Sequence, residues 1–452
     1  MNIKLPNEVI YIIKTLESHG FDAYTVGGCV RDCVMGKIPT DWDICTVATP
    51  EQTIQSFEKH RIIKTGLKHG TITLLLDENS YEITTFRKDG KYKDNRRPEE
   101  VLFISGIEED LKRRDFTINA LAYHPDKGII DCFGGIKDIE NKKIRCVGNA
   151  ENRFDEDALR IMRALRFSAT LDFEIHDDTS KAIIDKRDLL KNIAVERIAT
   201  ELNKLLIGKN MQTVLLKYSA VLAVIIPEIS DMIGFEQHSP NHYLDVWGHT
   251  VKSISYAPAD TILRLTMLFH DMAKPKCFTF SDGKGHFYGH PKQSAEMAET
   301  ILLRLKYDNS TIQTVSQLVT YHDTEIISEE KYVKRMLRKL GEENLRRLID
   351  AKKADALAHA EEIVASKLKK LEEILDLTNK VIKDKQCFSL KDLLVTGNDL
   401  LSLGVSGGKE VGEMLAQLLN MVIDGELENS QSTLLQKAQE LMQEKSTKQE
   451  KT

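Results

Sequence analysis

The chain has 452 residues, of which 41% are hydrophobic and 29% are charged. This length exceeds what one hydrophobic core usually serves, so we expect two to four structural units. The composition is that of a globular protein, which excludes a disordered or membrane-embedded chain. The formal net charge of −6 argues against non-specific duplex binding over the whole surface, but it permits a local basic channel.

The sequence carries no sign of a membrane or a secretory pathway. It has no apolar stretch of the roughly 18 residues that a membrane helix needs, and its N-terminus lacks the pattern of a signal peptide. The seven cysteines are scattered and form no CxxC pair, which fits reduced thiols better than disulfides or a zinc knuckle. We therefore expect a cytoplasmic protein with no membrane partner.

Short strands and helices alternate over residues 1–145. The segment NEVIYIIKTLESHG predicts a helix with Asn7 as its N-cap and Gly20 as its stop. Strands are predicted at FDAYTVGG, WDICT, TITLLLD and YEITTFR, and the last two form a hairpin-like pair across DENS. These elements favour a mixed sheet.

From about Glu151 onward the strand patterns vanish, and apolar residues recur at helical spacing. We predict that the rest of the chain is essentially all helix, with DEDALRIMRALRF as one helix. Histidines and a proline cluster near residue 236, which suggests a boundary there, and a Lys/Glu-rich helix begins near residue 361.

The segment VGGCVRDCVMGKIPTDWDICT, residues 26–46, carries the strongest chemical signal. A strand ends at Gly27 and Gly28 and a helix follows, so free backbone N–H groups at the helix start are available to a triphosphate. Asp41 and Asp43 are one residue apart in a predicted strand, so both carboxylates point to one face. Such a pair suits Mg²⁺ bound together with substrate phosphates, whereas the alternative is an exposed strand with two solvated aspartates.

Five segments resemble, in order, the motifs of the nucleotidyltransferase family that contains class II CCA-adding enzymes and bacterial poly(A) polymerases. They are GGCVRD, DWDICT, RRDFTINALAY, DCFGGIKDI and DEDALRIMRALRF, within residues 27–167. The resemblance implies an α+β fold with a mixed-sheet nucleotidyltransferase head at 1–145 and an all-α body. The body would comprise a neck at 146–235 that binds nucleobase and RNA, an HD-type domain at 236–360, and a C-terminal body or tail at 361–452.

The same resemblance implies the residue roles. Asp41 and Asp43 are the catalytic residues and hold Mg²⁺, which activates the 3′ hydroxyl of the primer and stabilises the leaving pyrophosphate. Gly27, Gly28 and Arg31 contact the triphosphate. Arg114 and Asp115 lie near the ribose and Asn119 of the same motif also binds nucleotide, although an Arg-Asp pair before a helix is also a common structural ion pair.

Glu156, Asp157 and Arg160 align with the nucleobase motif EDxxR of this family. Asp157 and Arg160 are three residues apart, so on one helix they share a face. A carboxylate accepts and a guanidinium donates hydrogen bonds, which matches the Watson–Crick edges of both cytosine and adenine and mismatches uracil and guanine. Arg163 and Arg166 continue the spacing and are further nucleotide-binding candidates. The alternative for Asp157 and Arg160 is an ordinary surface salt bridge.

A polar, charged segment, FRKDGKYKDNRRPEEVLF, precedes the third motif. By the resemblance, a loop at this place helps CCA-adding enzymes to switch from CTP to ATP, whereas enzymes that add only CC lack it. Its presence favours CCA or A addition, and the alternative is an ordinary solvated loop.

A second metal site is predicted in the histidine-rich region. His249, the pair His270-Asp271, and Asp355 follow the order H, HD, D of an HD phosphohydrolase domain, with His290 and His322 between them. In such domains imidazoles and carboxylates hold divalent metals that activate water. The pair His322-Asp323 competes with His270-Asp271 for the same role.

The leading hypothesis is therefore an enzyme that adds CCA, from CTP and ATP, to the 3′ end of tRNA without a template. An A-adding enzyme or a poly(A) polymerase is the alternative within the same fold. A metal-dependent phosphohydrolase centred on the HD region is the alternative of a different class.

Overall fold

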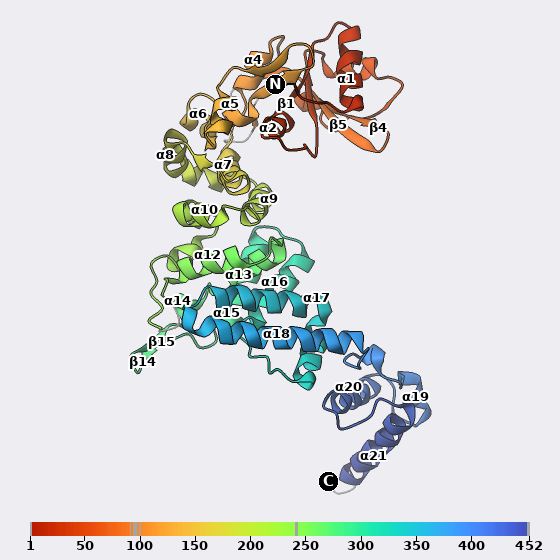
Figure 1. Ribbon diagram of the computed structural model, residues 1–452. Coiled ribbons are helices and arrows are strands. Elements are labelled where there is room, and N and C mark those ends of the chain that lie inside the picture. Colours follow the sequence, from red (N-terminus) through yellow and green to blue (C-terminus); the bar gives the residue numbers. More distant parts are fainter. Residues whose placement is uncertain (1, 91, 94–96, 99–100, 240–242, 450–452) are drawn as a thin grey trace. The chain divides into compact units, whose positions relative to one another are not determined.

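The computed structural model describes residues 2–90, 92–93, 97–98, 101–239 and 243–449 (Figure 1). It divides into two compact units. Unit 1 comprises residues 1–230 and 304–307, and unit 2 comprises residues 231–303 and 308–452. Part of the charged segment at 86–103 lies outside the described residues, so its predicted role in nucleotide switching stays a prediction.

Unit 1 is built on a seven-stranded sheet with the strand order β11-β10-β1-β2-β5-β4-β3. The pair β2 and β5 is parallel and the other neighbours are antiparallel, so the predicted mixed sheet is confirmed. The strands are β1 (Ala23–Val26), β2 (Asp43–Thr46), β3 (Arg61–Ile63), β4 (Thr71–Leu76), β5 (Asn79–Thr85), β10 (Leu121–His124) and β11 (Gly128–Asp131). Short strands beside the sheet are β6 (Arg87–Asp89), β7 (Tyr92–Lys93), β8 (Arg97–Pro98) and β9 (Val101–Phe103).

The predicted hairpin is also confirmed, since β4 and β5 pair antiparallel across a turn at Asp77, whose φ is 51°. Alternate residues of β4 are buried, as the period of a strand with one covered face requires. The helices of the head are α1 (Asn7–Ser18), α2 (Gly28–Val34), α3 (Pro50–Ser56), α4 (Ile107–Lys112) and α5 (Gly135–Glu140). Helix α1 ends before Gly20 as predicted, but Pro6 and not Asn7 is its N-cap residue.

The remaining helices of unit 1 are α6 (Ala150–Glu156), α7 (Leu159–Leu171), α8 (Asp177–Lys186), α9 (Val195–Leu206), α10 (Met211–Lys217) and α11 (Ser219–Ile225). The prediction of one helix over 155–167 is wrong. Helix α6 ends at Glu156, and the C-cap residue Asp157 has φ −137° and ψ 102°, which is extended backbone. Helix α7 therefore starts in a new direction, and its buried face includes Ile161 and Leu165.

The prediction that the rest of the chain is essentially all helix is confirmed, with a few very short strands in addition. Strands β12 (Lys143–Ile144) and β13 (Glu174–Ile175) pair in parallel. Strands β14 (Thr279–Ser281) and β15 (Lys284–His286) form a small antiparallel hairpin. Two- and three-residue strands leave too little alternation to be seen in a sequence pattern.

Unit 2 is otherwise helical. Its helices are α12 (Val246–Tyr256), α13 (Thr261–Phe269), α14 (Lys274–Cys277), α15 (His290–Arg304), α16 (Asn309–Tyr321), α17 (Glu330–Leu357), α18 (Glu361–Lys383), α19 (Gly397–Ser402), α20 (Lys409–Ile423) and α21 (Gln431–Gln449). Helices α17 and α18 lie side by side (Figure 1) and share a hydrophobic cluster that includes Leu348 and Ile374. A separate cluster, which includes Leu418 and Leu434, joins α20 and α21.

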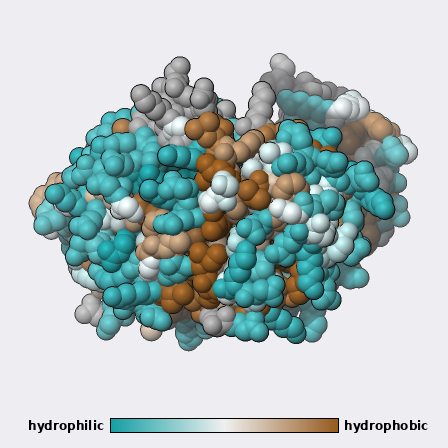
Figure 2. All heavy atoms as spheres, turned by 90° about the horizontal axis from the view of Figure 1, so that it is seen from above, coloured by the Kyte–Doolittle hydropathy of each residue, from teal (hydrophilic) through white to brown (hydrophobic). Residues whose placement is uncertain are grey.

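Figure 2 shows hydrophilic side chains over most of the visible face, with hydrophobic ones gathered toward its middle. Among the described residues, no helix combines the length and the apolar composition that crossing a bilayer requires.

Candidate functional site

A cavity of about 580 Å³ in unit 1 brings together residues from all the head motifs except DCFGGIKDI. Its lining consists of Gly27, Gly28, Arg31, Asp32, Thr40, Asp41, Asp43, Arg113, Arg114, Asp115, Asn119, Asp157, Arg160, Arg163, Arg166, Phe167, Arg197 and Lys204. Eight of these side chains are arginine or lysine and five are aspartate, so positive charge is in excess. Such a surplus suits a polyanionic ligand.

The floor of the cavity is the turn between β1 and α2. Gly27 has φ 83°, in the region that residues with a Cβ rarely adopt, and a Cβ added to it would lie 3.2 Å from the Arg114 Nη1 atom. Its amide donates a hydrogen bond to the Leu121 carbonyl of β10 at 2.9 Å. Both the backbone conformation and the close approach of Arg114 therefore require glycine here.

Asp41 and Asp43 both line this cavity beside the glycine turn. Strand β2 begins only at Asp43, so Asp41 precedes the strand instead of lying within it as predicted. Asp43 is open to the cavity, yet loss of hydration within its walls raises the pKa of the carboxyl group, and the charges of Asp41 and Glu82 raise it further, to about 6. This carboxylate would gain from a bound cation.

Arg114, Asp115 and Asn119 line the cavity, but they do not form the adjacent Arg-Asp ion pair considered from the sequence. The Arg114 Nη2 atom lies 3.2 Å from Asp110, and the Asp115 carboxylate lies 2.6 Å from Arg163 Nη2. Burial opposes ionisation of Asp115, but Arg163 outweighs it and lowers the pKa to about 2.

Asn119, in the motif RRDFTINALAY, is linked to the motif GGCVRD. Its amide group donates to Asp115 at 3.2 Å, and its Oδ1 atom accepts a hydrogen bond from Arg31 Nη1 at 2.6 Å. This chain of bonds fixes Arg31 before any ligand binds, so the site is pre-organised.

Glu156, Asp157 and Arg160 are close together, but their pairing differs from the prediction. Arg160 Nη1 lies 2.6 Å from Glu156 Oε2, and Arg160 Nη2 donates to the Arg113 carbonyl at 2.9 Å. Asp157 pairs instead with Arg197 at 3.1 Å. Asp157 and Arg160 line the cavity whereas Glu156 does not, because the helix break at Asp157 turns the two acidic side chains apart.

Several cavity residues were missed by the sequence analysis: Asp32, Thr40, Arg113, Phe167, Arg197 and Lys204. Phe167 lies under the guanidinium of Arg166, whose Cζ atom is 3.8 Å from the ring centroid. Arg197 and Lys204 come from α9, which lies outside every motif. The only signal in the sequence was their spacing of seven residues on one amphipathic helix.

Models of known families match three stretches of the chain. The Poly A polymerase head domain matches residues 23–145, the RNA and SrmB-binding site of polymerase A matches residues 172–233, and tRNA nucleotidyltransferase domain 2 matches residues 287–438. The CCA-adding enzyme of Enterococcus faecalis is 35% identical to this chain, over 95% of this chain and 96% of its own length. The chain belongs to the CCA-adding enzyme family.

Solved structures of CCA-adding enzymes agree with this assignment, and the predicted family resemblance is confirmed. The crystal structure of the Bacillus stearothermophilus CCA-adding enzyme in complex with CTP has a TM-score of 0.71 and 29% identity, and the match covers 98% of each chain. The Thermotoga maritima CCA-adding enzyme complexed with tRNA shares the fold, with a TM-score of 0.59 at 20% identity over 97% of this chain and 96% of its own.

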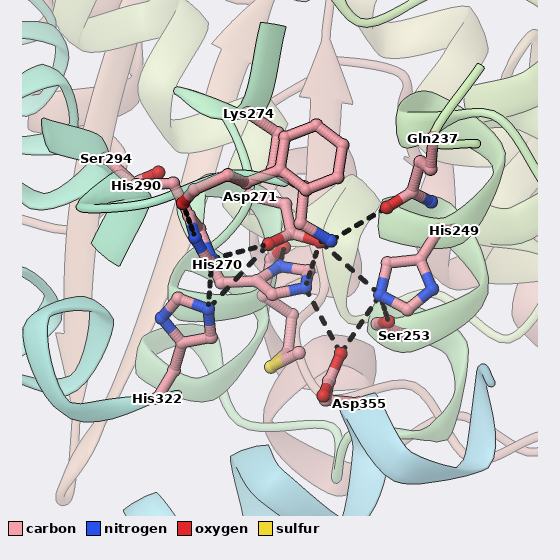
Figure 3. A network of polar contacts seen from close by, with 12 residues as sticks. Gln237, His249, Ser253, His270, Asp271, Lys274, His290, Ser294, His322 and Asp355 are labelled. Carbon is pink, nitrogen blue, oxygen red and sulfur yellow. Dashed lines mark hydrogen bonds and ion pairs between the residues drawn. The ribbon is translucent and has the colours of Figure 1, made fainter. Parts of the chain in front are cut away.

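Unit 2 of this family member holds a second cluster of chemical groups, shown in Figure 3. Two triads of metal-ligand type lie next to each other, the ligand atoms of each within 4.8 Å of one another. The first is His249, His270 and Asp355, and the second is Asp271, His290 and His322. The four residues predicted from the sequence are all present, and His290 and His322, which the prediction left without a role, complete the cluster.

Asp271 lies between the two triads. Its Oδ1 atom is 3.3 Å from His290 Nε2, and its Oδ2 atom is 3.2 Å from His270 Nε2 and 2.7 Å from Lys274 Nζ. Burial opposes protonation of His270, but Asp271 and Asp355 raise the pKa of the imidazole to about 10. A metal ion bound by His270 would therefore compete with the proton that these carboxylates favour.

Backbone carbonyls orient three imidazoles of this cluster. The Nδ1 atoms of His270, His290 and His322 lie 2.7, 2.9 and 2.7 Å from the carbonyls of Met267, Phe287 and Val319. Each ring therefore points its Nε2 atom toward the centre of the cluster. Metal-bound histidines are oriented in the same way, by a hydrogen bond from the ring nitrogen that does not bind the metal.

Proposed function

We propose that this chain adds CCA, from CTP and ATP, to the 3′ end of tRNA, as the names of its relatives indicate for them. The observation that carries the proposal is the placement of Asp41 and Asp43 beside the Gly27 turn in a cavity lined by eight cationic side chains. A carboxylate pair next to a triphosphate-sized basic site is what nucleotidyl transfer requires.

The residues present fit Mg²⁺. Asp41 and Asp43 offer hard oxygen ligands, and a bound cation would offset the loss of hydration and the repulsion from Asp41 that raise the pKa of Asp43. When bound, the metal ions lower the pKa of the attacking hydroxyl and stabilise the leaving pyrophosphate. The protein groups bind and orient the nucleotide: the Gly28 amide and Arg31 hold phosphates next to the Gly27 turn, and the region of Arg114, Asp115 and Asn119 holds the ribose.

Base selection rests on Asp157 and Arg160. The carboxylate accepts from the exocyclic amino group of cytosine or adenine, and the guanidinium donates to the adjacent ring nitrogen. Uracil and guanine present a carbonyl and an N–H group in the reverse places, so their polar groups would stay unpaired. The Glu156 carboxylate, 2.6 Å from Arg160, orients the guanidinium from outside the cavity.

The test is incorporation into tRNA transcripts that end before the CCA, after CC, or after the complete CCA. We expect CC addition with CTP alone, a complete CCA with both nucleotides, and no extension of the finished end. Asp41→Asn and Asp43→Asn should abolish both additions. Extension by ATP alone into long tails would overturn the proposal in favour of a poly(A) polymerase.

The histidine cluster favours a second candidate function, a metal-dependent phosphohydrolase. The ligand atoms of each triad lie within 4.8 Å of one another, and imidazoles and carboxylates are common metal ligands, so the six side chains fit two divalent cations. When bound, such cations supply an activated water. Metal analysis of the purified full chain, and phosphate-ester hydrolysis that survives Asp41→Ala with Asp43→Ala, would support it. A chain that takes up no divalent metal in unit 2 would exclude it.

A further inference from the structure

One cation of the nucleotide cavity has no anionic partner among the described residues. Each of the seven arginines in the lining lies 3.2 Å or less from a carboxylate oxygen. Lys204 of α9 also lines the cavity and is exposed. In the described part of the chain, no carboxylate oxygen lies within 4.0 Å of its ammonium group. The protein therefore neutralises the arginines itself, whereas the charge of Lys204 is available to a ligand.

Two neighbouring helices show where Lys204 lies along the cavity. Helix α9 packs alongside α7 (Figure 1). Arg197 pairs with Asp157, which precedes α7, and Glu201 pairs with Arg166, which lies well along α7. The two helices therefore run in the same direction. Residues 197, 201 and 204 share one face of α9, so Lys204 lies about 10 Å beyond Arg197 along the helix axis and one turn past Glu201.

The far end of α7 is the phosphate end of the proposed nucleotide site. The Cζ atom of Arg31, which we propose to hold phosphates, lies 5.3 Å from the centroid of the Phe167 ring. The Cζ atom of Arg166 lies 3.8 Å from the same centroid. The proposed base-binding residue Asp157 lies at the other end, before α7 begins. A nucleotide with its base at Asp157 and its phosphates at Arg31 therefore extends along α7, with its terminal phosphate toward Lys204.

The chemistry of a terminal phosphate suits a lysine at this place. Such a group carries between one and two negative charges at neutral pH, and its oxygens point in several directions. An ammonium group has three donors and, unlike a guanidinium, needs no planar arrangement of acceptors. An unpaired ammonium group can therefore bind this phosphate without first giving up a partner in the protein.

We propose that Lys204 binds the terminal phosphate of the incoming CTP or ATP and keeps its contact with the pyrophosphate that leaves. This inference rests on the proposed orientation of the nucleotide in the cavity. During transfer the 3′ oxygen of the tRNA forms a bond to the α-phosphorus. The bond from this phosphorus to the oxygen of the β-phosphate breaks, and its electron pair leaves with pyrophosphate. Because CTP and ATP carry the same triphosphate, Lys204 acts on both alike and takes no part in choosing the base.

The first test is equilibrium binding of CTP and of CMP to the full chain and to Lys204→Met, with Mg²⁺ and without tRNA. The variant should bind CTP about tenfold more weakly, the effect of losing one charge-assisted hydrogen bond, and should bind CMP as tightly as before. Lys204→Arg, which keeps the charge, should recover most of the affinity for CTP. Lys209→Met is the matched control, because Lys209 is exposed just after α9 and is not part of the cavity lining that the structure describes.

The second test is kinetic. In Lys204→Met the inhibition constant of inorganic pyrophosphate should rise about as much as the dissociation constant of CTP. The KM for tRNA and the preference for CTP over UTP should stay unchanged. A raised KM for tRNA with unaltered inhibition by pyrophosphate would overturn the inference, because Lys204 would then bind the RNA.

Two other outcomes separate this inference from the proposed function. Lys204 also lies in the last turn of α9, where a cation stabilises the end of a helix. If that is its whole role, Lys204→Met binds CTP normally while the unaltered chain still adds CCA, and only the inference fails. If the unaltered chain binds CTP no more tightly than CMP, the proposed placement of the triphosphate fails, and the inference fails with it.

Discussion

The raised pKa of Asp43 predicts how the affinity for Mg²⁺ depends on pH. Loss of hydration within the cavity and the charges of Asp41 and Glu82 raise this pKa to about 6 in the metal-free protein, and a protonated carboxyl group must lose its proton to bind the metal. At pH 7.5 the group is almost fully ionised. At pH 5 it is about nine-tenths protonated, so the apparent affinity should fall about tenfold between these two values.

The assay is Mn²⁺ binding to the metal-free full chain, followed by electron paramagnetic resonance from pH 5 to 8. Mutants of His270 and Asp271 supply a background without the second cluster. Glu82 is the residue paired with Asp43 across the parallel strands, so Glu82→Gln should move the midpoint down by about half a unit. Glu78→Gln, which removes the same charge in the hairpin turn, is the control. An affinity that stays flat down to pH 5 would refute the reasoning.

Three further predictions concern other parts of the protein. Asp115→Asn should lower the free energy of unfolding by about 2 kcal/mol at pH 7, because the pKa of about 2 means that this carboxylate stabilises the fold above its unfolded pKa. Denaturant titrations of both proteins should converge as the pH falls from 4 toward 2. Gly27→Ala should lower the free energy of unfolding by about 1–2 kcal/mol and remove most of the incorporation activity, since φ is 83°. An unaffected variant would show that the turn tolerates a side chain. His290→Ala should reduce metal content by about one ion per chain without changing CCA incorporation, and equal loss of both would contradict two independent sites.

Local patterns were enough to predict the head. Strands β4 and β5 show the alternation of a half-buried pair, and the turn at Gly27 needs a residue without a Cβ, so both are visible in the sequence. Asp41 and Asp43 were found for the same reason, because residues one position apart stay close in space whatever the rest of the chain does. The one difference, that Asp41 precedes β2, lies within the usual uncertainty of an element boundary.

Contacts between distant segments were beyond the reach of local patterns. The pairing of Asp157 with Arg197 and of Asp115 with Arg163 depends on how α7 packs on α9 and on the head. The break at Asp157 could not be seen because DEDALRIMRALRF contains neither glycine nor proline. In unit 2, His290 joins Asp271 only through the packing of α15 against the end of α13.

The central claim is that Asp41 and Asp43 hold the metal ions beside the bound nucleotide. Crystals of the full chain grown with CTP and Mn²⁺ test it by anomalous scattering. The account predicts peaks within about 2.2 Å of the carboxylate oxygens of Asp41 and Asp43, with the triphosphate next to Gly27 and Gly28. A well-ordered CTP in the cavity, with no manganese at either aspartate, would contradict it.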